Sequence, residues 1–194
     1  MSRAPKGSGS RSQLRIIGGQ WRGRKLAFTP EPGLRPTTDR VRETLFNWLA
    51  PDIHGARCLD LFAGSGALGL EALSRGAAHC DFIDTSRAAL RQIQSHLDSL
   101  GAGDTGHCRP GSAPDFLASA TGPWDMVFID PPFGAGLVEI TCALLDRPGL
   151  LAPHALIYVE TGKSEQPDFP GSWNLHREKQ AGDVCYRLFV VDPG

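Results

Sequence analysis

Several features of membrane, secreted and metal-binding proteins are missing from this sequence of 194 residues. No apolar run approaches the ~18 residues that a membrane-spanning helix needs, and the N-terminus is basic and polar where a secretory signal would be apolar. The five cysteines form no C-x-x-C pair, and the six histidines show no H-E-x-x-H spacing. We therefore expect a cytoplasmic protein with reduced core thiols, no membrane contact and no metal site.

The net charge of −1 hides a strong asymmetry along the chain. Residues 1–42 hold ten basic residues and two acidic ones, a balance of +8, so the remainder carries −9. A basic segment attached to an acidic body favours a polyanion as partner. Residues 1–13 are rich in Gly, Ser and Arg and are expected to be disordered, which leaves open a solvated tail without function. The basic residues beyond this tail that we expect to contact phosphates are Arg15, Arg22, Arg24, Lys25 and Arg35.

The hydrophobic pattern of the next residues predicts a small hairpin, a loop and a helix. Segments 14–17 and 20–22, on either side of two glycines, indicate a β-hairpin. Residues 30–36 contain several prolines and are expected to form a loop. Apolar residues then recur at helical spacing, which predicts a helix that begins at about Asp39 and ends before Pro51.

From there predicted strands alternate with predicted helices. The strands are expected at 57–62, 80–84, 107–109, 124–130 and 155–160, and the helices at 67–75, 86–100, 113–119 and 137–146. Apolar strands that alternate with helices imply an α/β fold, with a mostly parallel sheet covered by helices on both faces. Two further segments, 173–179 and 184–191, indicate an antiparallel hairpin at the C-terminal end.

The length of the chain limits its domain organisation. A chain of 194 residues can form one sizeable core and is too short for two large domains. We expect a disordered tail over 1–13 and a single domain over 14–194, in which 14–36 form the hairpin and loop and 37–194 form the α/β core. We also expect a monomer.

A glycine-rich turn, Asp60-Leu-Phe-Ala-Gly-Ser-Gly66, follows the first strand of the predicted core and begins a helix. Glycines let a ligand approach the backbone closely, and a helix N-terminus favours polar or anionic ligand groups. Asp84 ends the next strand, where a carboxylate can accept hydrogen bonds from both hydroxyls of a ribose. The candidate ligand-binding residues are therefore Asp60, Phe62, Gly64, Ser65, Gly66 and Asp84.

The same turn also matches the G-x-G-x-x-G fingerprint of dinucleotide-binding proteins. Asp60 distinguishes the two ligands, because its carboxylate would repel a pyrophosphate and attract the amino group of a methionine moiety. This charge favours S-adenosylmethionine over NAD, and the motif at Asp130 favours it further. A third interpretation, a tight turn without a ligand, leaves three glycines and two acids in register unexplained.

A second motif, Asp130-Pro131-Pro132-Phe133, follows a buried strand and therefore lies at the carboxyl edge of the predicted sheet, where open α/β folds bind ligands. An exocyclic base amine is a poor nucleophile because its lone pair is delocalised into the ring. Asp130 and the carbonyl of Pro131 would accept its two N–H groups and direct the lone pair toward a methyl donor. Phe133 would stack on a base that has left its own stack. The alternative is a proline-rich turn without a chemical role.

These two motifs, Asp60-x-Phe-x-Gly-x-Gly66 and Asp130-Pro-Pro-Phe133, resemble those of class I amino-methyltransferases of nucleic acids. Three further stretches resemble one bacterial family, the RsmD-type 16S ribosomal RNA guanine-N2 methyltransferases: 15–25, 34–47 and 174–179. The resemblance runs from about residue 14 to 191. It implies a seven-stranded Rossmann-like sheet, S-adenosylmethionine as cofactor, N2-methylguanosine as product, and ribosomal RNA or the small ribosomal subunit as partner.

The resemblance also implies further contacts with the cofactor. The stretch 35–42 would pack over it, which makes Thr38 and Arg40 candidate contacts. Ser112 and Ala113 follow the third strand at the same edge and are candidates for contact with the adenine ring. The chain departs from the family here, since relatives carry a longer or charged residue at this place. Ser112 is equally suited to cap the following helix.

Two other functions fit parts of the pattern. A DNA adenine-N6 methyltransferase would use a similar proline loop, but sequence-specific DNA enzymes usually have a separate target-recognition domain, which this chain lacks. A non-catalytic RNA-binding assembly factor would explain the basic segment. It would not explain the presence of Asp60, Asp84 and an intact Asp-Pro-Pro-Phe loop.

Overall fold

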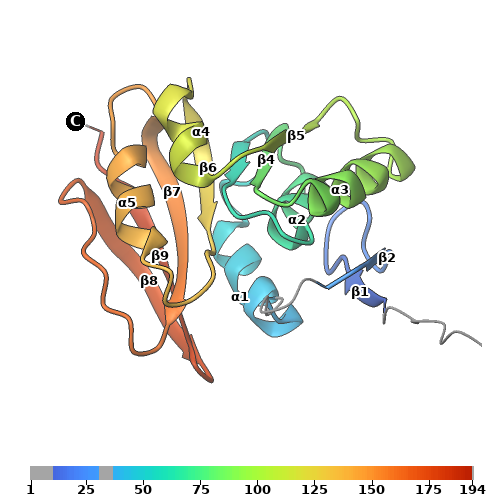
Figure 1. The fold of residues 1–194 in the computed structure, drawn as a ribbon, viewed down its shortest axis with the longest axis horizontal. Helices are drawn as coiled ribbons and strands as arrows, with labels where there is room; N and C mark the ends of the chain where they lie inside the picture. Colours follow the sequence, from blue (N-terminus) through green and yellow to red (C-terminus); the bar gives the residue numbers. More distant parts are fainter. Residues whose placement is uncertain (1–10, 31–36, 194) are drawn as a thin grey trace, which may run out of the picture.

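The structure is a computed structural model that describes residues 11–30 and 37–193 (Figure 1). A small antiparallel sheet pairs β1 (Ser12–Arg15) with β2 (Lys25–Phe28). The strands of the main sheet are β3 (Arg57–Asp60), β4 (His79–Asp84), β5 (Gly106–Pro110), β6 (Trp124–Ile129), β7 (Leu151–Gly162), β8 (Trp173–Ala181) and β9 (Val184–Val191). The helices are α1 (Asp39–Leu49), α2 (Ala67–Ser74), α3 (Arg87–Ser99), α4 (Ala113–Ser119) and α5 (Leu137–Leu145).

The main sheet has the strand order β5-β4-β3-β6-β7-β9-β8. The first five of these strands are parallel, and β9 lies antiparallel between β7 and β8. The chain builds outward from β3 through β4 to β5, and then returns to β6 on the other side of β3. In open α/β sheets, ligands bind outside the carboxyl ends of the strands at such a switch point. The predicted α/β fold, with its seven-stranded sheet and C-terminal hairpin, is confirmed.

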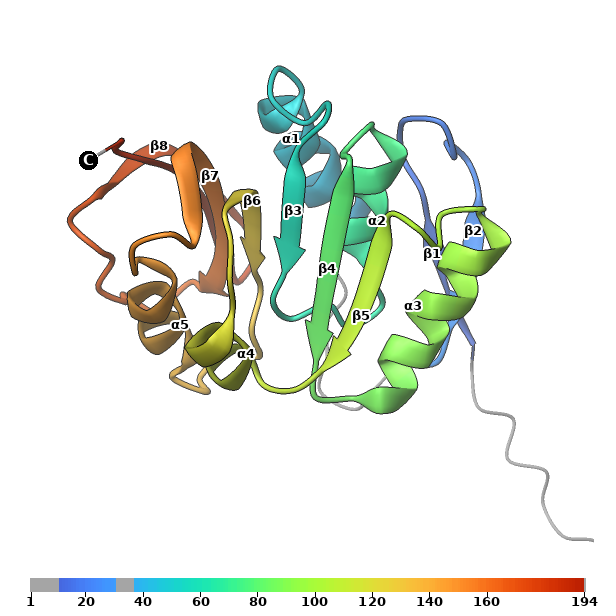
Figure 2. The same ribbon diagram turned by 90° about the horizontal axis from the view of Figure 1, so that it is seen from above.

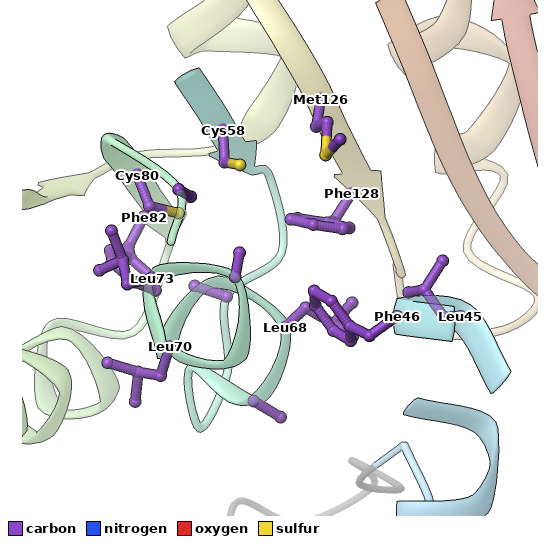
Figure 3. Packing of buried hydrophobic residues seen from close by; sticks show 14 of the residues in the cluster. Leu45, Phe46, Cys58, Leu68, Leu70, Leu73, Cys80, Phe82, Met126 and Phe128 are labelled. Carbon is purple, nitrogen blue, oxygen red and sulfur yellow. The ribbon is translucent and has the colours of Figure 1, made fainter. Parts of the chain in front are cut away.

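Successive side chains of the central strands enter two separate cores. In β6, Met126 and Phe128 belong to the core covered by α1, α2, α3 and the small sheet, whereas Val127 and Ile129 belong to the core under α4 and α5. Figure 2 shows α4 and α5 on one side of the sheet and α1 and α2 on the other. Figure 3 shows the ring of Phe128 near that of Phe46 from α1, with ring centroids 6.0 Å apart. Burial on both faces explains why this strand is almost continuously apolar.

Helix α2 packs unusually close to the sheet, and a glycine permits this approach. A Cβ atom at Gly69 would lie 2.2 Å from the ring of Phe82 on β4. Any larger residue would therefore push α2 away from the sheet. This contact fixes the N-terminal end of α2, and with it the glycine-rich turn that precedes the helix.

The predicted N-terminal hairpin is present, but its strands differ from the prediction. β1 begins at Ser12, inside the stretch expected to be disordered, and its partner strand is Lys25–Phe28 instead of 20–22. The reason is a contact with α2, because the backbone N–H of Gln20 donates to the carbonyl oxygen of Ser74 at 2.8 Å. The two glycines therefore belong to a turn that docks on α2, and the hairpin closes through a longer loop.

A buried carboxylate joins this N-terminal segment to the core. Glu71 of α2 is fully buried and accepts hydrogen bonds from the backbone N–H groups of Ile17 at 2.9 Å and Gly18 at 2.8 Å. It also forms ion pairs with Arg75 at 2.8 Å and with Arg42 of α1 at 3.4 Å. The small sheet and α1 are thus held against the same helix, beside the carboxyl edge of the main sheet.

The other predicted elements agree with the structure, most of them to within two residues at each end. The largest difference is β7, which begins at Leu151, four residues before the predicted start. Residues 1–10 of the predicted tail and residues 31–36 of the predicted loop lie outside the described residues. None of the described helices is long and apolar enough to cross a membrane.

Candidate active site

A cleft of about 820 Å³, part of it open to solvent, lies at the carboxyl edge of the main sheet. Asp60 at the end of β3 and Asp130 after β6 contribute its two carboxyl groups. Its walls come from the glycine-rich turn, from α3 and from the end of β2. Of the predicted site residues, those that line the cleft are Asp60, Phe62, Gly64, Ser65 and Asp130.

The glycine-rich turn has the backbone conformation that its sequence predicts. Gly64 and Gly66 have positive φ angles of 53° and 80°, which favour glycine, and Gly66 is the N-cap of α2. The carboxylate of Asp84, at the end of β4, holds the turn through a hydrogen bond. One of its carboxylate oxygens accepts from the N–H of Gly64 at 2.8 Å, and the other accepts from Ser86 at 2.8 Å. Each oxygen keeps a second lone pair, so Asp84 can still accept from ribose hydroxyls.

Asp60 is almost completely buried below this turn, with 2% of its surface exposed. Burial raises the pKa of Asp60 to about 7, and the charge of Asp84 adds to this effect. A hydrogen bond from the N–H of Gly69 at 3.1 Å opposes the rise. A cation next to this carboxyl is stabilised by its ionised form, whereas a phosphate would be repelled by the same charge. The donor set therefore fits the ammonium group of S-adenosylmethionine better than a dinucleotide.

The Asp-Pro-Pro-Phe loop follows β6 and is braced from both sides. Thr37, which precedes α1, donates its hydroxyl to Asp130 Oδ2 at 3.1 Å. At the other end of the loop, the N–H of Gly134 donates to Glu165 Oε1 at 2.7 Å. Pro131 is buried, whereas Pro132 is exposed and 41% of the Phe133 side chain is exposed. Pro131, Pro132 and Phe133 do not line the cleft as the described residues form it, but the exposed ring of Phe133, on the same loop as Asp130, is accessible for stacking on a base.

Asp130 has a second acidic neighbour that the motif did not predict. Glu160 on β7 is 4% exposed, and the β6–β7 register places it next to Asp130. The hydroxyl of Tyr158 donates to Glu160 Oε1 at 2.6 Å. Burial raises the pKa of both carboxyls, and the charge of Glu160 raises the pKa of Asp130 further. The signal for Glu160 was present in the sequence as a charged residue near the end of an apolar strand.

Six residues predicted to contact the cofactor do not line the cleft as the described residues form it, and two of them, Gly66 and Asp84, belong to the glycine-rich turn and its hydrogen bonds. Thr38 caps α1, where its hydroxyl oxygen accepts from the N–H of Val41, and the neighbouring Thr37 lines the cleft instead. Arg40 is exposed on α1. Ser112 caps α4, and Ala113 is buried in that helix. The predicted roles of these residues therefore depend on contacts that the structure does not show.

The N-terminal segment forms part of the cleft wall, which sequence patterns did not predict. The residues concerned are Ser12, Phe28, Thr29 and Pro30, together with Gln92 of α3. The N–H of Thr29 donates to Gln92 Oε1 at 2.9 Å and fastens the end of β2 to α3. No local motif could have indicated this, because the contact joins residues that are 63 positions apart.

The predicted phosphate contacts lie on the exposed surface of the same N-terminal segment. Arg15, Arg22, Arg24 and Lys25 are all exposed, and Arg15 lies directly opposite Lys25 in the small sheet. Like charges in such a cross-strand pair destabilise a sheet, so their pairing favours a role in binding an anion. None of the four is in an ion pair with another described residue. Arg35, the fifth predicted contact, lies outside the described residues.

One group of side chains has the composition of a metal site. His79, Asp81 and His107 at the amino ends of β4 and β5 have potential ligand atoms within 4.8 Å of one another. The carboxylate of Asp81 already accepts from Arg109 at 3.0 Å and from Trp124 Nε1 at 3.2 Å. These donors compete with a metal ion, and the absence of a metal site stays a prediction.

The fold and the cleft together define a class of protein. A parallel sheet completed by an antiparallel hairpin, with a glycine-rich turn after β3 and an Asp-Pro-Pro-Phe loop after β6, is that of a Rossmann-like class I methyltransferase. The family model described as "Conserved hypothetical protein 95" matches residues 14–190. The chain belongs to this family, which is the RsmD-type family that the motifs resemble.

Individual relatives agree with this assignment. The chain is 57% identical over 186 residues to "Ribosomal RNA small subunit methyltransferase D" of Escherichia coli (strain K12), covering 95% of this chain and 93% of the relative. It is 45% identical over 183 residues to the Haemophilus influenzae protein of the same name, covering 93% and 95%. The solved structure "Putative methyltransferase yhhF from Escherichia coli" superimposes with a TM-score of 0.86 at 54% identity, covering 94% of this chain and all of that one. As a class I methyltransferase of this family, the protein uses S-adenosylmethionine as its cofactor.

Proposed function

We propose that the protein methylates the exocyclic N2 amine of a guanine in small-subunit (16S) ribosomal RNA, in the cytoplasm. The observation that carries this proposal is the presence of Asp60 and Asp130 in one cleft, with the exposed ring of Phe133 on the same loop as Asp130. The first carboxyl suits a cationic cofactor and the second suits an amine. The printed names of the curated relatives, which are small-subunit ribosomal RNA methyltransferases, support the choice of RNA.

The residues around the glycine-rich turn hold the cofactor. Asp60 would accept from its ammonium group, and Asp84 would accept from its ribose hydroxyls. The positive φ angles at Gly64 and Gly66 keep side chains out of the turn, so the cofactor can approach the backbone. The bound cofactor supplies an electrophilic methyl group.

The loop after β6 prepares the base. Asp130 and the carbonyl of Pro131 accept the two N–H groups of the amine, so that its lone pair is directed at the methyl carbon. Such positioning of two reactants contributes most of the rate gain in a reaction of this type. Phe133 stacks on the flipped base and compensates for part of the stacking energy lost on leaving the RNA.

The basic N-terminal segment binds the RNA backbone. The four exposed side chains of Arg15, Arg22, Arg24 and Lys25 form a cationic surface next to the cleft wall. Contacts with phosphates provide affinity and orientation but little sequence preference. The selection of one guanine therefore depends on the shape of the RNA around it and on the pocket at Asp130.

One assay tests the whole proposal. The protein is incubated with S-adenosylmethionine carrying a labelled methyl group and with ribosomal RNA or isolated small subunits, and the modified nucleoside is identified after digestion. The expected product is N2-methylguanosine, and the Asp130→Ala variant serves as the negative control. Labelled N6-methyladenosine, or transfer to DNA but not to RNA, would contradict it. Binding of cofactor and RNA without transfer would instead indicate a non-catalytic assembly factor.

A further inference from the structure

Glu160 lies beside Asp130 across the β6–β7 ladder, and the proposed function gives it no role. Phe128 is the register partner of Tyr158, and the same register two residues further along sets Asp130 next to Glu160. Glu160 is almost completely buried, so the two carboxyl groups lie next to each other with little water around Glu160. The hydroxyl of Tyr158 holds Glu160 Oε1 at 2.6 Å, and the hydroxyl of Thr37 holds Asp130 Oδ2 at 3.1 Å.

Two adjacent carboxyl groups can hydrogen-bond to each other only when one of them carries a proton, because an ionised carboxylate can only accept. The other groups that face the pair offer no positive charge. They are Asp60 at the end of β3, the hydroxyls of Thr37 and Tyr158, and Tyr186, the register partner of Glu160 on β9. No ion pair among the described residues joins either carboxyl to a Lys, Arg or His side chain.

Two adjacent negative charges in this setting would repel each other in a low dielectric without compensation. The pair therefore keeps one proton at neutral pH. The raised pKa of both carboxyls, caused mainly by burial, agrees with this conclusion. Because the two groups titrate together, the proton belongs to the pair and not to one residue.

We propose that Glu160 is a positioning residue that shares one proton with Asp130, so that the pair presents a single negative charge to the target amine. This inference rests on the proposed function, in which Asp130 accepts from the amine. When the N–H groups of the amine reach Asp130, they favour its ionised form and the shared proton moves to Glu160. Glu160 then donates to Asp130 and holds it in place.

The pair also provides a destination for the proton that the reaction releases. The lone pair of the amine forms the new N–C bond while the bond from methyl carbon to sulfur breaks and leaves its electron pair on sulfur. The methylated amine now carries a positive charge and loses one proton to Asp130. The pair then holds two protons and no charge, and the loss of one of them to solvent through the cleft restores the starting state.

The first test measures the shared proton without any reaction. Infrared spectra of the cofactor-free protein are recorded above the pH of about 7 at which Asp60 ionises. Wild type should retain a protonated-carboxyl band there, and Asp60→Asn, the matched control, should retain it too. In Glu160→Gln and Asp130→Asn the band should vanish or titrate at least about one pH unit lower, because the neighbouring charge is gone. A band missing from wild type, or unchanged in Glu160→Gln, would overturn the proposal.

The second test uses the pH profile of single-turnover methyl transfer. The wild-type rate should fall at high pH, where the last shared proton leaves the pair. Glu160→Gln still donates to Asp130 but cannot ionise, so it should lose this alkaline limb. An unaltered profile in Glu160→Gln would contradict the role of Glu160.

Tyr158→Phe provides a second variant in case Glu160→Gln does not fold. It removes the hydroxyl that stabilises ionised Glu160 and should move the alkaline limb to higher pH, whereas a purely structural role predicts an equal loss at every pH. The proposal is also overturned if this limb does not move. Failure of the proposed function looks different, because wild type itself would then produce no N2-methylguanosine.

Discussion

Asp60→Asn tests the cofactor site most directly, because it removes only the ability to ionise. The amide oxygen can still accept from the N–H of Gly69, which lies 3.1 Å from the carboxylate oxygen in the wild-type structure. Since burial raises the pKa of Asp60 to about 7, the wild-type carboxyl is mostly protonated below this pH and mostly ionised above it. Only the ionised form can make a charge-assisted hydrogen bond with the ammonium group of the cofactor, which contributes about 1.5–3 kcal/mol.

We therefore expect the affinity of wild type for S-adenosylmethionine to rise with pH, and that of Asp60→Asn to stay constant. At about pH 8 the variant should bind about 10–100-fold more weakly, and at about pH 6 protonation of Asp60 should have narrowed this difference about tenfold. Calorimetry in buffers of different ionisation enthalpy measures the protons released on binding. Wild type should release up to about 0.9 proton per cofactor at about pH 6 and close to none at about pH 8.

The stability of the cofactor-free protein gives an independent measure of the same carboxyl. The pKa of Asp60 is about 7 in the folded state and 3.8 as the ordinary value, so the folded state binds more protons between these two values. The free energy of unfolding therefore falls as pH rises through this window, by up to about 4 kcal/mol for this residue. Above pH 7, Asp60→Asn should be the more stable protein in denaturant titrations. If wild-type affinity is independent of pH and the variant gains no stability, Asp60 does not have the assigned role.

Changes at three other places test the remaining parts of the site. Asp130→Ala should lower turnover about 100-fold or more while cofactor affinity stays close to wild type, and a folded variant with a normal single-turnover rate would refute the assignment. Phe133→Ala should weaken capture of the base by about 1–3 kcal/mol, seen as a higher KM for RNA, whereas Phe133→Tyr should be tolerated because it keeps an aromatic face. The third test neutralises four basic side chains together: Arg15, Arg22, Arg24 and Lys25. The salt dependence of RNA binding should become flatter, by close to one unit of slope for each phosphate that is no longer bound, while cofactor affinity stays unchanged. An unaltered slope would show that these residues do not bind phosphates.

Local patterns predicted the main sheet because its central strands are buried on both faces and its helices on one. The uniformly apolar run of β6 and the helical spacing in α3 are visible in the sequence without any tertiary information. The strands of the N-terminal hairpin differ from the predicted ones for the opposite reason. Its turn is decided by hydrogen bonds to Ser74 and Glu71, which lie more than 50 residues away, and a preference for a tight two-glycine turn cannot include them.

The candidate site divides in the same way. Asp60, Asp84 and Asp130 were predicted because each adjoins a recognisable local motif. Thr37 reaches Asp130 and lines the cleft while Thr38 caps α1, so the contact of Thr38 with the cofactor stays a prediction. The contribution of β2 to the cleft wall depends on how the small sheet docks on α3, and no spacing in the sequence encodes that arrangement.

Glu160 could have been predicted from the sequence, although it is far along the chain from the Asp130 motif. The reason is that successive side chains of a strand point to opposite faces of the sheet. Four strands near the middle of the sheet, β3, β4, β6 and β7, carry an inward-facing Cys, Phe or Tyr two positions before an acid: Cys58 and Asp60, Phe82 and Asp84, Phe128 and Asp130, Tyr158 and Glu160. Side chains two apart lie on the same face of a strand, so all four acids belong to the face covered by α1, α2 and α3. Gathering four carboxyls at one edge opposes folding, since burial and mutual repulsion raise the pKa of the buried ones. This loss of stability is expected where a protein must bind a cationic cofactor and then accept a proton. An acid two positions after an inward-facing Cys, Phe or Tyr in several strands is therefore a sequence signal for the site.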